Sequence, residues 1–274
     1  MTKKQAFLRK LVTSPYLVWA ALFIVVPLAM VAYYAFTDAK GNFTLANIKR
    51  LGDYTDIFLR SIWYALIATV ICLVIAYPLA YIISQSKASR QRIMIMLTML
   101  PMWMNFLLRT YSWMAILEDT GIINSLLTSI GLPAIHMINT PFAVILGMVY
   151  NFLPYMVLPI YSVMCKLDKS TIEAAEDLGC NNPGVFSRII LPLSMPGVIS
   201  GITMVFVPSV STFYISQKLG GSKYDLIGDT IERQFQTSYN YNLGAAISLV
   251  LMILILACLA VMNKFSDDDG GVII

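Results

Sequence analysis

The sequence predicts an all-α membrane protein with six transmembrane helices. Hydrophobic residues make up 58% of its 274 residues and charged residues only 12%, whereas about 25% of the residues in a soluble domain are charged. So few charged groups cannot solvate the whole surface of a folded chain. Six apolar stretches each approach the roughly 20 residues that a helix needs to cross the hydrocarbon core of a bilayer.

The six predicted spans follow one another along the whole chain. Each should be a helix, because lipid offers the backbone no hydrogen-bond partner. Basic residues precede the first span as in a signal peptide, but its apolar run exceeds the roughly 7–15 residues of a signal, so we expect an uncleaved anchor. The spans are predicted at 16–36, 62–83, 93–113, 142–163, 196–217 and 244–262.

The loop charges predict the orientation of these spans. Eleven Lys and Arg residues lie in the terminal segments and loops on one side, against seven in the alternating loops. Lys87, Arg90 and Arg92 crowd a short loop of the first set, while 114–141 on the opposite side has no Lys or Arg. Positive loops stay in the cytoplasm, so both termini should be cytoplasmic.

Prolines lie at depth in several spans and should kink their helices. Membrane helices tolerate such prolines, although Pro154 and Pro159 in the fourth span would also let a pore-lining helix bend. The prolines are Pro27, Pro78, Pro101, Pro154, Pro159 and Pro208.

Several function classes are disfavoured by composition. The net charge of +4 is spread over loops, without the aromatic-interleaved basic stripe that binds nucleic acid. The single histidine, His136, stands alone in a loop and cannot build a metal cluster. We expect no disulfide and no metal site, because the cysteines lie in apolar runs or near the cytoplasmic face: Cys72, Cys165, Cys180 and Cys258.

The loop between spans four and five, 166–195, contains the strongest pattern. Ser170 and Glu173 have the spacing of a capping box, which predicts a short helix from Thr171 to Leu178. Gly179 suits the left-handed position after that helix. Asn182 and Pro183 predict a second short helix that runs toward Ile190 and stops at Pro192. Capping alone is equally compatible with a surface hairpin that has no partner.

The same loop matches a longer pattern, E-A-A-x3-G-x9-I-x-L-P. This pattern resembles the EAA loop of binding-protein-dependent ABC importer permeases. The resemblance implies that the chain folds as an ABC type I importer permease bundle, with a single permease domain over 1–274. It also implies that this loop is a cytoplasmic coupling helix that enters a groove on an ATPase. The matching residues are Glu173, Ala174, Ala175, Gly179, Ile189, Leu191 and Pro192.

The resemblance also implies the partners. The sequence has no Gly-rich phosphate-binding loop ending in Lys-Ser or Lys-Thr, so the chain should not be an enzyme and should hold no cofactor. ATP and Mg²⁺ are expected on the partner ATPase. We expect two ATPase subunits, a second and similar permease, an extracytoplasmic binding protein, and a location in the bacterial inner membrane.

Other segments resemble the PotB-type permeases of spermidine/putrescine importers. They are Pro101–Tyr111, Lys166–Lys169 and Gly220–Gly228. A polyamine substrate is therefore expected, although related permeases for other small solutes share the architecture. Selectivity between putrescine and spermidine would rest largely with the binding protein.

Candidate residues for the substrate path follow from the charge of a polyamine. None of the six spans contains Asp or Glu, so aromatic faces are the remaining groups that attract a cation within the membrane, although packing is the commoner role of such residues. Outer carboxylates could attract a cation, or could simply be solvated loop residues. The candidates are Trp103, Tyr150, Tyr155, Tyr161 and Tyr214 in the spans, and Glu118, Asp119, Asp225, Asp229 and Glu232 outside them.

Arg109 is the one charged residue within a predicted span. A fixed cation would repel a polyamine, so we expect Arg109 to form a structural ion pair with Glu118 or Asp119 and to hold an outer gate.

Three rival classes of membrane protein fit the sequence less well. An ion-coupled secondary transporter would need ionisable groups near the midplane of the membrane. An enzyme would need a catalytic cluster, and a channel would need a ring of charge.

Overall fold

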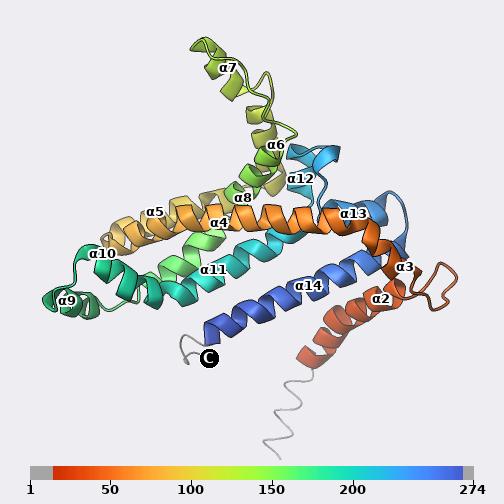
Figure 1. The fold of residues 1–274 in the computed structure, drawn as a ribbon, viewed down its shortest axis with the longest axis horizontal. Helices are drawn as coiled ribbons and strands as arrows, with labels where there is room; N and C mark the ends of the chain where they lie inside the picture. Colours follow the sequence, from red (N-terminus) through yellow and green to blue (C-terminus); the bar gives the residue numbers. More distant parts are fainter. Residues whose placement is uncertain (1–14, 268–274) are drawn as a thin grey trace, which may run out of the picture. The chain divides into compact units, whose positions relative to one another are not determined.

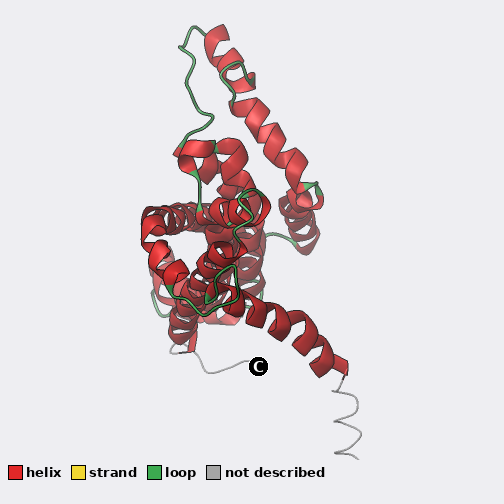
Figure 2. Ribbon diagram, turned by 90° about the vertical axis from the view of Figure 1, so that its right-hand side faces the viewer, coloured by secondary structure: helices red, strands yellow, loops and turns green. Residues whose placement is uncertain are grey.

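The computed structural model describes residues 15–267, so the basic residues before the first span lie outside the described part. Nearly all of the described secondary structure is helical, with one isolated β-bridge between Thr37 and Phe43 (Figure 2). Five helices are long and apolar enough to cross a membrane, and the number is six if one pair of helices, bent by 90°, counts as a single span. The prediction of an all-helical protein with several membrane spans is confirmed. The chain divides into two compact units, residues up to Thr55 with Thr230–Ile255, and Asp56–Asp229 with the segment from Leu256 onward.

The first unit joins the first span to the start of the last span. A helix over Pro15–Ala35 contains a π-helix, η1 (Ala21–Val25), and α2 (Val26–Ala35). The short α3 (Ala46–Lys49) and η2 (Arg50–Tyr54) follow, and the unit also holds most of α13 (Ile227–Gln236) and the start of α14 (Tyr241–Asp267).

Small residues and one amide hold this first unit together. Ala35, Ala245 and Ala246 are buried against one another, which lets α2 and α14 approach closely. Asn242 donates from Nδ2 to the backbone oxygens of Tyr34 (3.1 Å) and Thr37 (2.8 Å). These bonds satisfy carbonyls that the end of α2 leaves without helical partners.

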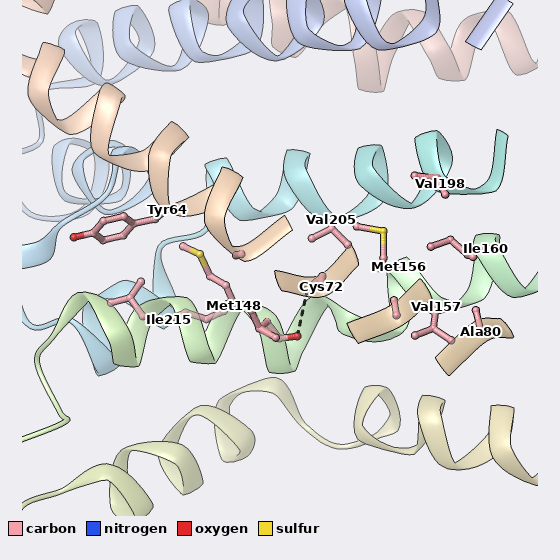
Figure 3. Packing of buried hydrophobic residues seen from close by; sticks show 14 of the residues in the cluster. Tyr64, Cys72, Ala80, Met148, Met156, Val157, Ile160, Val198, Val205 and Ile215 are labelled. Atoms are coloured by element: carbon pink, nitrogen blue, oxygen red, sulfur yellow. Dashed lines mark hydrogen bonds between the residues drawn. The ribbon is translucent and has the colours of Figure 1, made fainter. Parts of the chain in front are cut away.

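The second unit is built around three long helices, α4 (Thr55–Gln85), α8 (Pro141–Met164) and α11 (Leu191–Ser211). They run side by side in Figure 1 and share one hydrophobic core, seen in Figure 3. The face that α4 turns to this core carries a stripe of buried small side chains at helical spacing, Ala68, Cys72, Ala76 and Ala80. Small side chains permit close helix packing where lipid gives no hydrophobic driving force.

Glycines bring α11 against α8. A Cβ on Gly197 would lie 2.9 Å from the carbonyl oxygen of Pro159, and a Cβ on Gly201 would lie 2.7 Å from Sδ of Met156. Both glycines occupy one face of α11, four residues apart, so the two backbones can meet only where side chains are absent. Prolines inside α8 and α11 do not end these helices.

The third predicted span, 93–113, is not one helix. It consists of α5 (Ala88–Trp103) and α6 (Phe106–Leu117), and the helical segments on either side of the break are bent by 90°. Asn105 begins α6 as its N-cap, because its Oδ1 accepts from the amides of Leu107 (2.8 Å) and Leu108 (3.4 Å). The prediction of a continuous helix here is wrong because it overlooked this capping residue, which follows Pro101 by four positions.

Beyond α6 the chain forms α7 (Ile122–Ser129), and α6 and α7 extend away from the long helices of the unit in both views (Figures 1 and 2). The fifth predicted span ends six residues early, at Ser211, and α12 (Tyr214–Leu219) and η4 (Ser222–Tyr224) follow it. Gly228 lies against this end, where a Cβ would come within 2.4 Å of the carbonyl oxygen of Thr212.

Candidate functional site

The loop between α8 and α11 forms an elbow, residues 166–192, that starts with helix α9 (Lys169–Asp177). Asp168 is the N-cap and accepts from the backbone amide of Ser170 at 3.0 Å. This hydrogen bond lowers the pKa of the exposed Asp168 carboxyl, because it favours the ionised form. The expected capping box at Ser170 and Glu173 is therefore wrong by two positions, since the carboxylate of Asp168 caps first.

The C-terminus of α9 agrees with the sequence prediction. Gly179 has φ +85°, in the left-handed region. Its amide donates to the carbonyl of Glu176 (2.9 Å), and the amide of Cys180 donates to Ala175 (3.0 Å). These two bonds form a Schellman motif. A Cβ on Gly179 would meet nothing within 4 Å, so the backbone angle and not space requires glycine.

The second arm of the elbow is one continuous helix, in contrast to the prediction. Asn181 caps α10 (Asn182–Val185) by accepting from the amide of Gly184 at 3.0 Å. A π-helix, η3 (Phe186–Ile190), then leads directly into α11. Pro192 lies in the first turn of α11, where it does not stop the helix as expected. The wider π turn before it relieves the clash between a proline ring and the carbonyl four residues earlier.

The elbow is anchored on the long helices of its unit. Val185, Ile190 and Ala175 are buried in the shared core. The ring of Phe186 packs edge-on against Tyr77 (5.7 Å) and Tyr81 (6.2 Å) of α4. Close by, the hydroxyls of Tyr77 and Ser194 are hydrogen-bonded at 2.8 Å. A displacement of the elbow would therefore move α4 and α11 with it.

The opposite side of α9 is exposed. Glu173 and Ala174 are exposed, and the side chain of Leu178 is 87% exposed. The two alanines of the motif therefore lie on opposite sides of α9, with Ala174 exposed and Ala175 buried. In the second arm Ile189 is half-buried, Leu191 is 38% exposed and Pro192 is exposed. Leu178 was missed by the sequence analysis, although a leucine beside Gly179 was a visible signal.

The candidate path residues do not form one site. Trp103 is 71% exposed at the end of α5, and Tyr155 is partly exposed beside Phe152. Tyr150 packs edge-on against Trp113 at 5.2 Å, and the hydroxyl of Tyr161 donates to Oε1 of Gln91 at 3.4 Å. These last two side chains link neighbouring helices, which is a packing role.

Tyr214 belongs to an aromatic cluster with Phe106 and Tyr111, between α12 and α6. Its ring centroid lies 5.7 Å from that of Phe106 and 6.3 Å from that of Tyr111. Two cations lie against this aromatic cluster, Arg109 over Phe106 at 5.9 Å and Lys218 over Tyr111 at 5.4 Å and Tyr214 at 5.7 Å. Phe106, Tyr111 and Lys218 were not predicted as site residues. The spacing of Lys218, four residues after Tyr214 in a helix, was a signal for this contact.

The ion pair expected for Arg109 is wrong. Arg109 is only 8% exposed, and its Nε and Nη1 have no hydrogen-bond partner among the described residues. Asp119 instead pairs with His136, with 2.8 Å between Oδ1 and Nδ1, and Glu118 is exposed. The α6–α7 turn positions Asp119 away from Arg109, so the buried guanidinium is held by an aromatic face.

The outer carboxylates are dispersed. Asp225 is half-buried, while Asp229 is buried at 3% exposure and accepts from the amide of Leu226 at 2.7 Å. Asp229 is thus a structural residue of its turn, and neither expected alternative, a cation-attracting group or a solvated loop residue, applies to it. Within the described chain, no group of three or more His, Cys, Asp or Glu could hold a metal ion.

The elbow and the helical order match known proteins. The family model of binding-protein-dependent transport system inner membrane components matches residues 76–267. The chain is 38% identical to the spermidine/putrescine transport system permease protein PotB of Haemophilus influenzae, over 86% of each chain. It is 40% identical to the PotB of Escherichia coli, over 86% of this chain and 89% of that protein. It is also 29% identical to the inner membrane ABC transporter permease protein YdcU of E. coli, over 87% of this chain and 82% of that protein.

Solved structures show the same fold at low identity. A chain of a bacterial ABC transporter involved in the import of the acidic polysaccharide alginate superposes with a TM-score of 0.78, over 97% of this chain and 96% of that chain, at 16% identity. The same transporter in complex with an alginate-pentasaccharide-bound periplasmic protein gives 0.79, also at 16% identity, over 99% and 98% of the two chains. The family match covers most of the chain and includes the whole elbow, and so this protein belongs to the binding-protein-dependent transport system inner membrane components.

Proposed function

We propose that this chain is the membrane permease subunit of an ATP-driven importer of polyamines, spermidine or putrescine. The observation that carries the proposal is the 38–40% identity to PotB permeases over 86% of the chain. The chain would cross the inner membrane several times with both termini in the cytoplasm, as the excess of Lys and Arg in the short loop at 84–92 supports.

In this proposal the elbow is the coupling element. Its outward face presents Glu173, Ala174 and Leu178, which combine a charge, a small side chain and an exposed apolar side chain. An exposed leucine next to a small residue fits a groove on another protein, since burial of the leucine would favour docking. The inward face, through Ala175, Val185 and Ile190, is packed on the long helices and would transmit the movement of an ATPase to them.

The mechanism that follows is alternating access. ATP and Mg²⁺ would bind to two ATPase subunits, whose closure would push the elbow. Because Phe186 packs on α4 and Ser194 is hydrogen-bonded to Tyr77, the push would reach α4 and α11 together. The chain itself would perform no chemistry. It would bind a second, similar permease and, outside the cell, a polyamine-binding protein.

The protruding α6–α7 segment is the proposed contact for the binding protein. It presents Glu118 and Asp119 on its exposed surface, and these carboxylates would attract a cationic substrate or a basic surface. The exposed Trp103 and Tyr155 remain proposed path residues, since aromatic faces bind ammonium groups. Asp225 remains a candidate at the outer end of the path.

A related importer for another solute is the second candidate, and one observation favours it. Arg109 is buried without a carboxylate partner among the described residues, and Lys218 adds a second positive charge to the same aromatic cluster. Two fixed cations would repel a polycation unless their charge is screened or displaced.

The test is ATP hydrolysis by the assembled complex. The chain would be co-purified with its ATPase, partner permease and binding protein, and reconstituted into nanodiscs. Spermidine with its binding protein should stimulate hydrolysis, and Glu173→Ala or Gly179→Asp should abolish stimulation without loss of the membrane subunits. A complex without ATPase activity would refute the importer. Stimulation by a different solute alone would refute the polyamine.

A further inference from the structure

The ammonium group of Lys218 is held by two tyrosine rings from different helices. Nζ lies 5.7 Å from the ring centroid of Tyr214, one turn earlier on α12, and 5.4 Å from that of Tyr111 on α6. The two rings stand edge to face, with an interplanar angle of 84°. No carboxylate of the described residues lies within ion-pair distance of Lys218, so the two tyrosines are its electrostatic partners.

This two-ring arrangement differs from an ordinary surface lysine. Tyr111 is 43% exposed and Lys218 is half-buried, so the rings can be reached from outside the chain. The neighbouring Arg109 is bound to the third ring of the aromatic cluster, Phe106, and leaves the two tyrosines to Lys218. Aromatic faces arranged around an ammonium group form the kind of site that recognises cationic ligands.

The chemistry of the Lys218 side chain identifies the class of ligand that would compete with it for the two rings. A lysine side chain is a four-carbon chain that ends in a primary ammonium, which is the aminobutyl end of putrescine and of spermidine. The Tyr111–Tyr214 pair therefore already binds, from within the chain, the group that the proposed substrate presents.

We propose that Lys218 is a tethered competitor that occupies an aminobutyl-binding site formed by Tyr111 and Tyr214, and that an incoming polyamine ammonium displaces it. This inference rests on the proposed polyamine function. Because one ammonium replaces another of the same kind, the rings are never left without a cation and the exchange costs little free energy. Lys218 also links α12 to α6 through Tyr111. Its displacement by substrate would break that link and let the two helices move relative to each other.

A tethered group competes strongly. The effective concentration of the Lys218 ammonium at the two rings is on the order of millimolar for a short flexible connection. The substrate must therefore compete with this tethered group to occupy the rings. A cation–π contact changes a binding equilibrium by about two- to thirtyfold. Removal of the competing ammonium should therefore tighten polyamine binding by about the same factor.

The first measurement uses the unmodified complex in nanodiscs. The acylation of Lys218 by an amine-reactive reagent is followed by peptide mass spectrometry, with and without saturating spermidine, and is expressed as a ratio to the acylation of Lys223, because the amines of spermidine also consume the reagent. Lys223 is the internal control, since its Nζ lies 5.7 Å from the single ring of Tyr224. Spermidine should raise the ratio at least threefold.

The second measurement is direct spermidine binding to the complex without its binding protein. Lys218→Met, which keeps the length and removes the charge, should tighten binding by about two- to thirtyfold. Lys218→Arg should bind like the parent, and Tyr111→Leu added to Lys218→Met should remove the gain. Unchanged or weaker binding by Lys218→Met overturns the inference.

The two proposals fail in different ways. If spermidine stimulates ATP hydrolysis but leaves the acylation ratio of Lys218 to Lys223 unchanged, the competitor role is refuted and the polyamine importer stands. If no polyamine stimulates hydrolysis by the complete complex, the proposed function is refuted and the inference falls with it.

Discussion

The exposed Leu178 gives the sharpest test of the elbow. Fully burying a leucine side chain stabilises an interface by about 1.5–3 kcal/mol, and 87% of Leu178 is available for burial. Truncation to alanine removes most, but not all, of that apolar surface. Leu178→Ala should therefore weaken docking of the ATPase by about 1–2 kcal/mol, which is roughly five- to thirtyfold in Kd.

The assay is titration of the purified ATPase onto the permease in nanodiscs, with bound ATPase as the signal. The same substitution should leave thermal unfolding of the permease unchanged, because exposed side chains contribute little to stability. Leu126→Ala on α7, where the leucine is 62% exposed, is the matched control and should bind the ATPase like the parent. Parent-like docking by Leu178→Ala would refute the assignment of this face to the ATPase.

Substitutions at three further positions, Gly179, Asp168 and Gly201, test the local geometry. Gly179→Val should destabilise the end of α9 by about 1–2 kcal/mol, because the backbone angle φ at this position is +85°. Gly179→Asn should destabilise it less. Hydrogen exchange of residues 169–178 measures both effects. Asp168 has a lowered pKa, so its cap stabilises α9 at pH 7 and is lost as the pH falls below 3.8 through that lowered pKa. Asp168→Ala should raise exchange in α9 at pH 7, and Asp168→Asn should remove the pH dependence. Gly201→Val should lower the thermal stability by about 1–3 kcal/mol, because a Cβ there meets Met156 at 2.7 Å, while Gly52→Ala, which meets nothing within 4 Å, should not.

Each of these expectations has an opposing outcome. Equal exchange in the valine and asparagine variants at Gly179 would show that the left-handed angle does not limit the elbow. Protection of α9 that does not change on acidification would remove Asp168 as its cap. An unfolding temperature unaffected by Gly201→Val would mean that α8 and α11 can separate without loss of stability.

The sequence predicted what depends on local chemistry and on the bilayer. The spans follow from the length of each apolar stretch, and the solved transporter structures confirm the helical fold. The turn at Gly179 follows from the freedom of glycine at positive φ, and the structure places it there. Both features need only the residues of one segment and a general rule.

The errors arose where two local signals compete. Asp168 and Ser170 can each cap α9, and the carboxylate does so. Asn105 can lie inside an apolar helix or start a new one, and its hydrogen bonds with two amides start a new one. Only the surrounding fold decides between such alternatives.

The pairing of Arg109 failed for a different reason. Sequence proximity suggested Glu118 or Asp119, but α6 is a rigid helix and the following turn directs Asp119 to His136. Phe106, the aromatic partner of Arg109, lies on the same helix, but the contact of Lys218 with Tyr111 comes from packing between α12 and α6, which are about a hundred residues apart in the sequence. Contacts at such separation are not encoded in any local pattern.

The π turn at Phe186–Ile190 has a consequence for how this segment tolerates change. A π turn holds one residue more than an α turn and completes nearly the same rotation about the helix axis. Deletion of a single residue here would therefore let the helix run on as a regular α-helix and leave the elbow facing almost the same way. A deletion in the regular turns of α11 cannot be absorbed in this way: each α-helical residue rotates the chain by about 100°, so the elbow would turn by roughly that angle.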